Sequence, residues 1–286
     1  MGIFFAFISL FSWGLGDFLI QRSTRKFGTW LVLFFITAAA SIVLLPFVFH
    51  DIKLLTISWQ HWPLLILLSC TFLLAVFFDF EALRRGKISV VNPIYALEVP
   101  IVAILAAVIA HEFLNSWQIV IILLLFLGLV LLSVTSFSIF KKIHVETGAG
   151  WAFIGTIFMG AGNFLCLYAS RQTNPLLVNW FTSVLLAIFC LIMLLRKFKK
   201  QEILLAIKEN KKLIINMVFF DNLAWIAYAY SGLYLPLAIA TGITESYIAV
   251  SVILGLKFNH EKLKGHQFFG LAITIICAIV LAFISE

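Results

Sequence analysis

Apolar residues in this chain fall into long runs separated by short breaks that carry charged residues, Gly or Pro. Each run has roughly the 20 residues that a helix needs to cross a hydrocarbon core about 30 Å thick. The alternation over about 10 residues that would indicate a membrane β-strand is absent. The pattern predicts an all-α membrane protein with ten transmembrane helices, near residues 3–21, 28–49, 62–84, 88–110, 115–136, 149–170, 175–196, 212–233, 236–256 and 265–284.

The longest break, residues 197–212, alternates basic and apolar residues. Such a segment is too polar to cross the bilayer, but it can lay an apolar face on the bilayer surface. We therefore expect a short amphipathic helix there, before the eighth span.

The two halves of the chain resemble each other. Residues 6–19 align with residues 152–165 with seven identities, and Asp17 then stands opposite Asn163. Because each half holds five spans, an odd number, the halves must have opposite orientations, as in inverted-repeat transporters. We expect residues 1–143 to form the first five-helix repeat and residues 144–286 the second. Three further matches follow at nearly the same offset: Glu98 with Glu245, His111 with His260, and Gln118 with Gln267.

Composition agrees with an integral, multi-pass protein, which we expect in the plasma (cytoplasmic) membrane. Hydrophobic residues make up 63% of the chain and charged residues 12%, against about 45–50% and 25% in soluble proteins. The formal charge of +7 does not indicate a nucleic-acid partner, because the basic residues are spread among membrane loops. The four cysteines lie in separate apolar runs, which predicts buried packing thiols and no disulfide.

The loop charges predict the orientation of the chain. Of the 20 Lys and Arg residues, all but Lys53 and Arg171 lie in or beside the connections that follow odd-numbered spans. Since cytoplasmic loops carry an excess of Lys and Arg, these connections are predicted to be cytoplasmic. Both termini are then extracytoplasmic.

Two matched stretches, residues 82–118 and 234–270, resemble the EamA-like family of the drug/metabolite transporter superfamily. Each has a short turn, a helix that we expect to be interrupted near its middle, then Glu and a helix start that contains Gln. The motif positions are Glu98, Pro100, Glu112, Glu245 and Glu261. The resemblance implies secondary active transport, often export. Tyr247 departs from the motif where the first half has Pro100, and the family is usually drawn with cytoplasmic termini.

Glu98 and Glu245 are the first candidate site residues, because each lies near the middle of a span. A charge at the bilayer centre costs about 2.5–3.5 kcal/mol, so both should face the bundle interior and mark a solute or proton path. Two carboxylates held close together cannot both ionise cheaply, and we expect Glu98 to be the one that titrates. Asn92 and Tyr95 share the Glu98 face, and Pro100 can open the helix beside them. A protonated structural carboxyl and a simple packing kink are the alternatives.

Asp221, Trp225 and Tyr228 lie at i, i+4 and i+7 on one face of the eighth span. A carboxylate beside aromatic rings suits an organic cation through charge pairing and cation–π contact. Ordinary helix packing is an equal alternative, because 15% of the chain is aromatic.

Trp13, Asp17 and Asn163 complete the candidate set, as polar or aromatic residues in the two matched segments. Asp17 follows Trp13 by one turn and is also close enough to Arg22 to pair with it at the membrane boundary. Asp79 and Glu81 are likewise close enough to Arg84 to pair with it at the membrane boundary instead of taking part in a site.

The acidic and aromatic interior favours a small cationic or zwitterionic organic solute, with protons as a candidate coupling ion. A neutral sugar or amino acid carried by uptake or exchange is the alternative. A membrane enzyme and a passive channel are less well supported, because the chain lacks a nucleophile elbow, a phosphate loop and a filter motif. The six histidines show no metal-ligand spacing, so we expect no metal and no cofactor.

Overall fold

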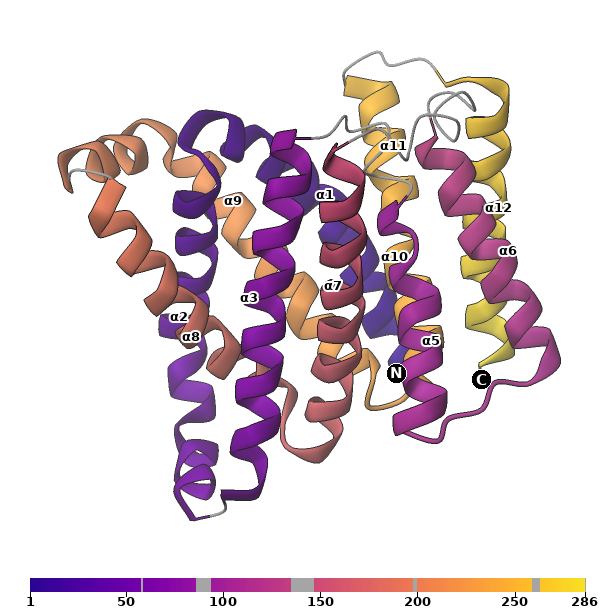
Figure 1. Ribbon diagram of the computed structural model, residues 1–286, viewed down its shortest axis with the longest axis horizontal. Coiled ribbons are helices and arrows are strands. Elements are labelled where there is room, and N and C mark those ends of the chain that lie inside the picture. Colours follow the sequence, from indigo (N-terminus) through magenta and orange to yellow (C-terminus); the bar gives the residue numbers. More distant parts are fainter. Residues whose placement is uncertain (58, 86–93, 135–146, 198–199, 259–262, 286) are drawn as a thin grey trace.

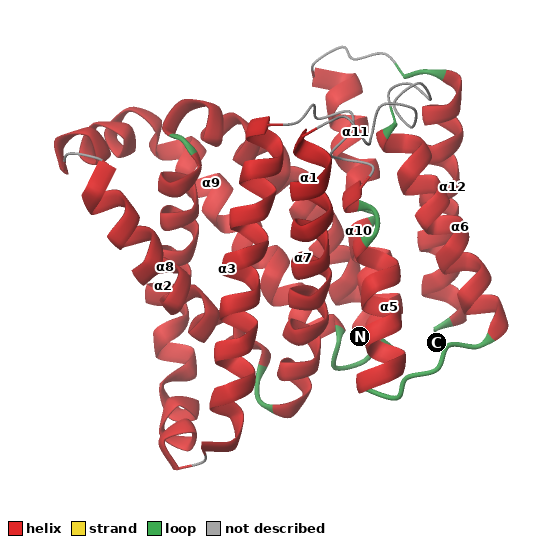
Figure 2. Cartoon of the chain, in the orientation of Figure 1, coloured by secondary structure: helices red, strands yellow, loops and turns green. Residues whose placement is uncertain are grey.

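The computed structural model describes residues 1–57, 59–85, 94–134, 147–197, 200–258 and 263–285. The described residues form helices that are joined by loops, and they include no strand (Figure 2). The first half contains α1 (Gly2–Phe27), α2 (Thr29–Ile57), the short 3₁₀ turn η1 (Trp59–His61), α3 (Trp62–Arg85), α5 (Glu98–Ile109) and α6 (Ser116–Ser133). The second half contains α7 (Thr147–Gln172), α8 (Pro175–Lys197), α9 (Lys200–Ser231), α10 (Leu237–Glu245), α11 (Tyr247–Phe258) and α12 (Gly265–Ile284).

Nine segments in the described residues are long and apolar enough to cross a membrane, and the shorter apolar helix α5 adds a tenth candidate. The predicted spans and the observed helices agree closely, so the all-α, membrane-spanning fold is confirmed. The predicted amphipathic segment is helical from Lys200 and joins the eighth span at Asn210, whose backbone is non-helical (φ −128°, ψ 27°).

Matched residues of the two halves begin matched helices in the same way. The Gln118 side-chain oxygen accepts a hydrogen bond from the Asn115 N–H at the start of α6 (3.0 Å). The Gln267 oxygen accepts one from the Lys264 N–H at the start of α12, also at 3.0 Å. Each bond satisfies a backbone donor that a helix start leaves open, which explains why Gln occurs at both positions.

The helices pack in the pattern expected of two halves related by a two-fold axis. The first helix of each half packs on the third helix of the other, so that α1 lies on α9 and α7 lies on α3. Three further contacts join counterparts of the two halves, α2 with α8, α5 with α10 and α6 with α12, while α5 also packs on α7 and α11 packs on α1. Figure 1 shows the α2–α8 pair at one side of the molecule and the α6–α12 pair at the other. The two halves are therefore interleaved.

Two glycines shared by the repeated segments lie at close helix crossings, Gly14 between α1 and α11 and Gly160 between α7 and α5. A Cβ on Gly14 would lie 2.6 Å from a side-chain carbon of Val250 in α11, and one on Gly160 would lie 2.7 Å from Ile101 in α5. Side chains cannot approach this closely, so both crossings depend on glycine. The repeat in the sequence therefore reflects close helix packing around the centre.

Both central glutamates lie at breaks between helical segments. Residues 96 and 97 form a turn, and Glu98 is the first residue of α5. Glu245 is the last residue of α10, and the chain turns at Ser246 before α11 begins. The predicted interruption at Glu-x-Pro is thus shifted: the break comes before Glu98, and Pro100 lies in the first turn of α5, where its missing N–H has no helical partner to lose.

The four cysteines are free thiols, as predicted, and Cys166, Cys190 and Cys277 are buried. The prediction of a buried thiol is wrong for Cys70, which is exposed on α3. An outward-facing position in a membrane span contacts lipid, and an apolar run alone does not distinguish that face from the core.

Candidate functional site

A buried polar contact joins the two halves at the centre of the molecule. The Asn163 side-chain N–H in α7 donates a hydrogen bond to a Glu98 oxygen at the start of α5, at 3.0 Å. Asn163 is 2% exposed and Glu98 9% exposed. The other side-chain atom of Asn163, its amide oxygen, is buried with no hydrogen-bond partner among the described residues. The contact therefore combines one strong bond with one open acceptor.

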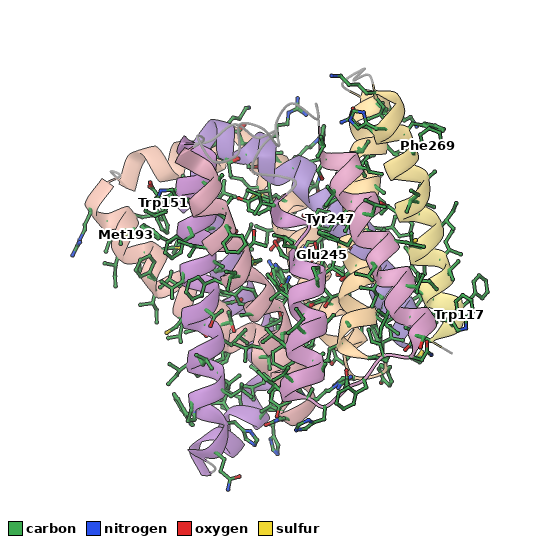
Figure 3. The ribbon with its side chains drawn as sticks, turned by 45° about the vertical axis from the view of Figure 1, so that its right-hand side comes forward. Trp117, Trp151, Met193, Glu245, Tyr247 and Phe269 are labelled. Atoms are coloured by element: carbon green, nitrogen blue, oxygen red, sulfur yellow. The ribbon has the colours of Figure 1, made fainter. Side chains whose placement is uncertain are left out.

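Tyr228 of α9 continues this polar centre. Its hydroxyl forms a hydrogen bond with the Thr241 hydroxyl in α10 at 2.8 Å and lies 3.4 Å from the Asn163 backbone oxygen. Glu245, at the end of α10, is also buried, with 8% of its surface exposed. Figure 3 shows Glu245 and Tyr247 deep inside the bundle, whereas Trp117 and Phe269 lie at its periphery. Through Asn163 and Thr241, Tyr228 is connected to Glu98 and to the helix that Glu245 ends, and the joint role of the two glutamates stays a prediction.

An aromatic cluster surrounds Tyr228. The Trp13 ring of α1 lies 4.9 Å from Trp225, 5.2 Å from Tyr228 and 5.9 Å from Tyr247. Trp225 also contacts the Phe72 ring of α3 edge-on, at 5.0 Å. Three of the predicted site residues, Trp13, Trp225 and Tyr228, are thus brought together from two helices.

A cavity of about 330 Å³ lies beside this cluster. Its walls come from α1, α2, α3, α7, α8 and α9, and it extends from Thr24 and Thr29, near the connection of α1 and α2, to Asp221 and Trp225 in the middle of α9. Glu98 and Glu245 do not line it. The structure therefore separates the predicted site residues into a cavity that contains Asp221 and a buried centre that contains the two glutamates.

Sequence reasoning missed several polar residues of this cavity. Asn179, Thr182, Ser183 and Asn222 lie on its walls in α8 and α9. The signal was a polar residue inside an apolar run, the same signal that identified Asp221. It is weaker for these residues because neutral polar side chains are common in membrane helices.

The remaining candidates are placed less centrally or cannot be placed. The Tyr95 hydroxyl lies 3.5 Å from the Asp79 backbone oxygen, between α3 and the start of α5. One Asp79 carboxylate oxygen is buried against α7 without a partner among the described residues, and the predicted pairing of Asp79 with Arg84 lies outside them. Asn92, Glu261 and the side chains of Asp17 and Arg84 lie outside the described residues.

Glu112 and Arg171 form an ion pair at the end of the molecule that holds both termini (Figure 1). Arg171 of α7 also donates hydrogen bonds to the backbone oxygens of Gly232 and Leu235, in the connection between α9 and α10. Glu112 accepts the Leu237 N–H that begins α10, at 2.8 Å. This network, the Arg171–Glu112 tie, joins three connections at the end of the molecule opposite the basic loops.

The sequence profile of the EamA-like transporter family matches residues 1–134 and again residues 146–283. Together the two matches cover nearly the whole chain, one in each half. The chain belongs to the EamA-like transporter family. The predicted family is thereby confirmed, and with it the reading of the fold as two related helical repeats.

A solved crystal structure has the same fold as this EamA-like chain. The superposition covers 99% of this chain and 98% of the other, with a TM-score of 0.72 and 14% sequence identity. At that identity the likeness concerns the fold alone. No curated protein sequence matches the chain.

Membership of the EamA-like family makes the chain an integral, multi-pass membrane protein of the drug/metabolite transporter type. Proteins of this family are transporters that handle small solutes in the membrane, and they are not enzymes. The described residues contain no group of three or more His, Cys, Asp and Glu side chains close enough together to hold a metal ion.

Proposed function

We propose that this chain is a secondary active transporter that exports a small organic solute in exchange for protons, with cationic and zwitterionic solutes favoured. One observation carries the proposal. Trp225 lines the cavity and packs against Tyr228, and the Tyr228 hydroxyl lies at the buried centre beside Asn163, the hydrogen-bond donor to Glu98. A solute that moves Trp225 therefore acts on the environment of a buried carboxyl.

The exchange mechanism follows from electrostatics. Burial favours the neutral form of a carboxyl, whereas a nearby cation favours the charged form. A cationic solute bound beside Asp221 then favours loss of the proton from Glu98 at the neighbouring centre, and return of that proton favours release of the solute.

The shape of the cavity and the loop charges support export as the direction of transport. The cavity extends toward the connection of α1 and α2, on the side of the basic loops, and the Arg171–Glu112 tie joins the connections at the opposite end. We place the basic side in the cytoplasm, so that both termini are extracytoplasmic and the protein loads solute from inside the cell. The membrane is then the plasma (cytoplasmic) membrane.

A second candidate function is uptake or exchange of a neutral solute. The observation that favours it is the neutral polar wall of the cavity, where Asn179, Ser183 and Asn222 can bind hydroxyl groups. In that case Asp221 binds a solute without pairing a charge.

Transport into proteoliposomes tests both functions. Purified protein is reconstituted, a proton gradient is imposed, and the uptake of labelled amines, amino acids and sugars is followed. Gradient-driven accumulation of an amine or amino acid supports the proposal, and accumulation of a sugar supports the second candidate. Flux that ignores the gradient overturns secondary active transport.

A further inference from the structure

Asn163 connects Glu98 to the second half of the molecule. Its side-chain N–H in α7 donates a hydrogen bond to a Glu98 oxygen at 3.0 Å, and the two residues are 2% and 9% exposed. The helix crossing positions them: a Cβ on Gly160, one turn before Asn163, would lie 3.5 Å from the Glu98 Cα. The close approach of the two backbones therefore brings the amide within reach of the carboxyl.

The backbone of Asn163 contacts a residue that packs beside the cavity. The Tyr228 hydroxyl lies 3.4 Å from the Asn163 backbone oxygen, and the Tyr228 ring packs on Trp225, which lines the cavity. Asn163 itself does not line the cavity, although Met159 and Cys166 of the same helix do. Its side chain therefore meets the carboxyl of Glu98 and not the cavity.

An amide is well suited to control a buried carboxyl. Its N–H is a neutral donor, and a hydrogen bond donated to the charged form of an acid stabilises that form. Because the amide does not titrate, it stabilises ionised Glu98 and still allows the carboxyl to take up a proton. A Lys or Arg in this place would add a full positive charge. The matched position of the first half is Asp17, an acid, so the neutral donor is particular to the second half.

The helices around α5 carry other titratable groups near this centre. α10 ends with Glu245, which is 8% exposed. α7 contains Cys166, α9 contains Tyr228, and Tyr95 comes just before α5. α6, all of whose residues are described, carries no titratable side chain. Tyrosine and cysteine stay neutral where carboxyls titrate, so Glu245 is the member of this set that changes charge in the same range as Glu98.

We propose that Asn163 is a positioning residue, whose amide orients Glu98 and stabilises the ionised carboxyl, and which thereby sets the pH range over which Glu98 exchanges its proton. Asn163 then acts through Glu98, a different role from the direct solute contact expected from the sequence. The proposal rests on the proposed function, in which Glu98 carries the coupled proton, and it names the residue that regulates this step.

Infrared titration of the purified full-length protein, without solute, measures the proposed effect. The carboxyl absorption of protonated Glu98 is identified by its loss in Glu98→Gln, and its midpoint is followed across a pH series. Asn163→Leu removes the donor at similar side-chain size. We expect it to move the Glu98 midpoint upward by about one to two pH units, a roughly tenfold to hundredfold gain in proton affinity. Asn163→Gln keeps an N–H donor and should shift the midpoint less.

Asn174→Leu is the matched control. The Asn174 N–H also donates to a carboxylate at 3.0 Å, that of Asp51, but in the connection of α7 and α8. Its loss should leave the Glu98 midpoint unchanged. Asn163→Leu should also give the same upward shift in a Glu245→Gln background, which separates the effect of the amide from that of the neighbouring carboxyl.

The unaltered protein provides a further measurement, which applies even if Asn163→Leu does not fold. Asparagine labelled with heavy nitrogen in its side chain has a shifted amide band. Protonation of Glu98 alters the hydrogen bond to Asn163, so a label-sensitive change should follow the same midpoint as the Glu98 carboxyl band. It should be absent in Glu98→Gln.

Three outcomes overturn the proposal: an unmoved or lowered Glu98 midpoint in a folded Asn163→Leu protein, an equal upward shift in Asn174→Leu, or an asparagine band that does not respond when Glu98 titrates. Transport that is lost at every pH while the midpoint stays unmoved gives Asn163 a structural role alone. Flux that ignores the proton gradient overturns the proposed function, whereas an upward shift of the midpoint still establishes the effect of Asn163 on Glu98.

Discussion

Glu98 and Glu245 occupy matched positions but meet different surroundings. Glu98 begins α5, where free N–H groups interact favourably with negative charge, and it also accepts the Asn163 N–H. Glu245 ends α10, where the exposed groups are carbonyls. Two of the carbonyls near this end accept hydrogen bonds from side chains: the Ser246 hydroxyl donates to the Gly242 oxygen, and the Thr244 hydroxyl donates to the Ala240 oxygen. The two carboxyls are therefore unequal, although the sequence repeat makes them look equivalent.

We predict that Glu98→Gln removes the pH dependence of transport while the protein remains folded. Glutamine keeps an oxygen that can accept the Asn163 N–H, so the contact between α5 and α7 survives while the titrating group is lost. Transport in proteoliposomes across a pH series measures the effect. Glu245→Gln is the control: it should weaken solute affinity and retain the pH profile. An unchanged profile in Glu98→Gln would make Glu98 a structural carboxyl.

At the scale of single residues, the sequence indicated which polar residues are unusual but not which of them lie together. An acid inside an apolar run is costly, so Glu98, Glu245 and Asp221 were recognisable. The division of these three between a cavity and a buried centre was not, because it depends on which face of each helix meets a neighbour. Arg171 was also missed, since a basic residue at a helix end resembles ordinary membrane-flanking charge.

Gly160 permits the close crossing of α7 and α5, and a second glycine of α7 provides a matched control. Gly160 lies against Ile101 and the Glu98 backbone, whereas a Cβ on Gly150 of the same helix would meet no atom within 4 Å. We predict that Gly160→Ala lowers the free energy of unfolding by about 1–3 kcal/mol through overpacking. Gly150→Ala should leave it unchanged or raise it by up to about 1 kcal/mol, since alanine favours helices.

Denaturant unfolding of the two purified variants measures this difference. Because both changes are Gly to Ala in one helix, the intrinsic preference for helix cancels in the comparison. Equal stability of the two variants would show that the crossing of α5 and α7 can expand without cost.

The Arg171–Glu112 tie connects the ends of elements that carry the two glutamates. Glu112 follows α5, which Glu98 begins, and it also binds the first N–H of α10, which Glu245 ends. We predict that Arg171→Gln loosens this end of the molecule. The readout is maleimide labelling of Ala238→Cys, a position now 1% exposed, in a Cys70→Ser background. Labelling should accelerate at least fivefold.

Arg196→Gln is the control for this experiment. It removes the same charge from an exposed residue near the end of α8, on the opposite side of the membrane, and should not change labelling of Ala238→Cys. If both variants accelerate labelling equally, general destabilisation explains the result and the tie does not close this end.

For the whole molecule, the number and place of the spans could be predicted from the sequence with little error. Long apolar runs fix the helices, and five spans per repeat require inverted halves. The predicted interruption lies a few residues after the observed break, because Pro100 does not interrupt a helix but lies in the first turn of α5, which Glu98 begins. The interleaved packing of α1 on α9 and α7 on α3 was not predictable, since the apolar faces of membrane helices are similar in sequence.

The orientation in the membrane remains a prediction of the whole chain. Eighteen of the 20 Lys and Arg residues lie on the side of the odd-numbered connections, and the described termini lie at the other end. Green fluorescent protein fused after Glu286 should therefore stay dark in a bacterial host, because it does not fold when exported. Alkaline phosphatase fused at the same position should be active. Bright fluorescence and an inactive phosphatase would place the termini in the cytoplasm.

The interleaved packing of the two halves also determines when α1 can meet its partner helix during biosynthesis. The helix that α1 packs against ends at Ser231, so roughly 200 residues are made after α1 before its partner is complete, about 10–40 s at about 5–20 residues per second. Throughout that interval the Trp13 and Ser9 face of α1, buried in the finished protein, has no permanent neighbour. The nascent first half must therefore wait in the membrane, shielded by lipid or by the insertion machinery. A chain that stops before α9 is expected to remain unassembled and to be degraded.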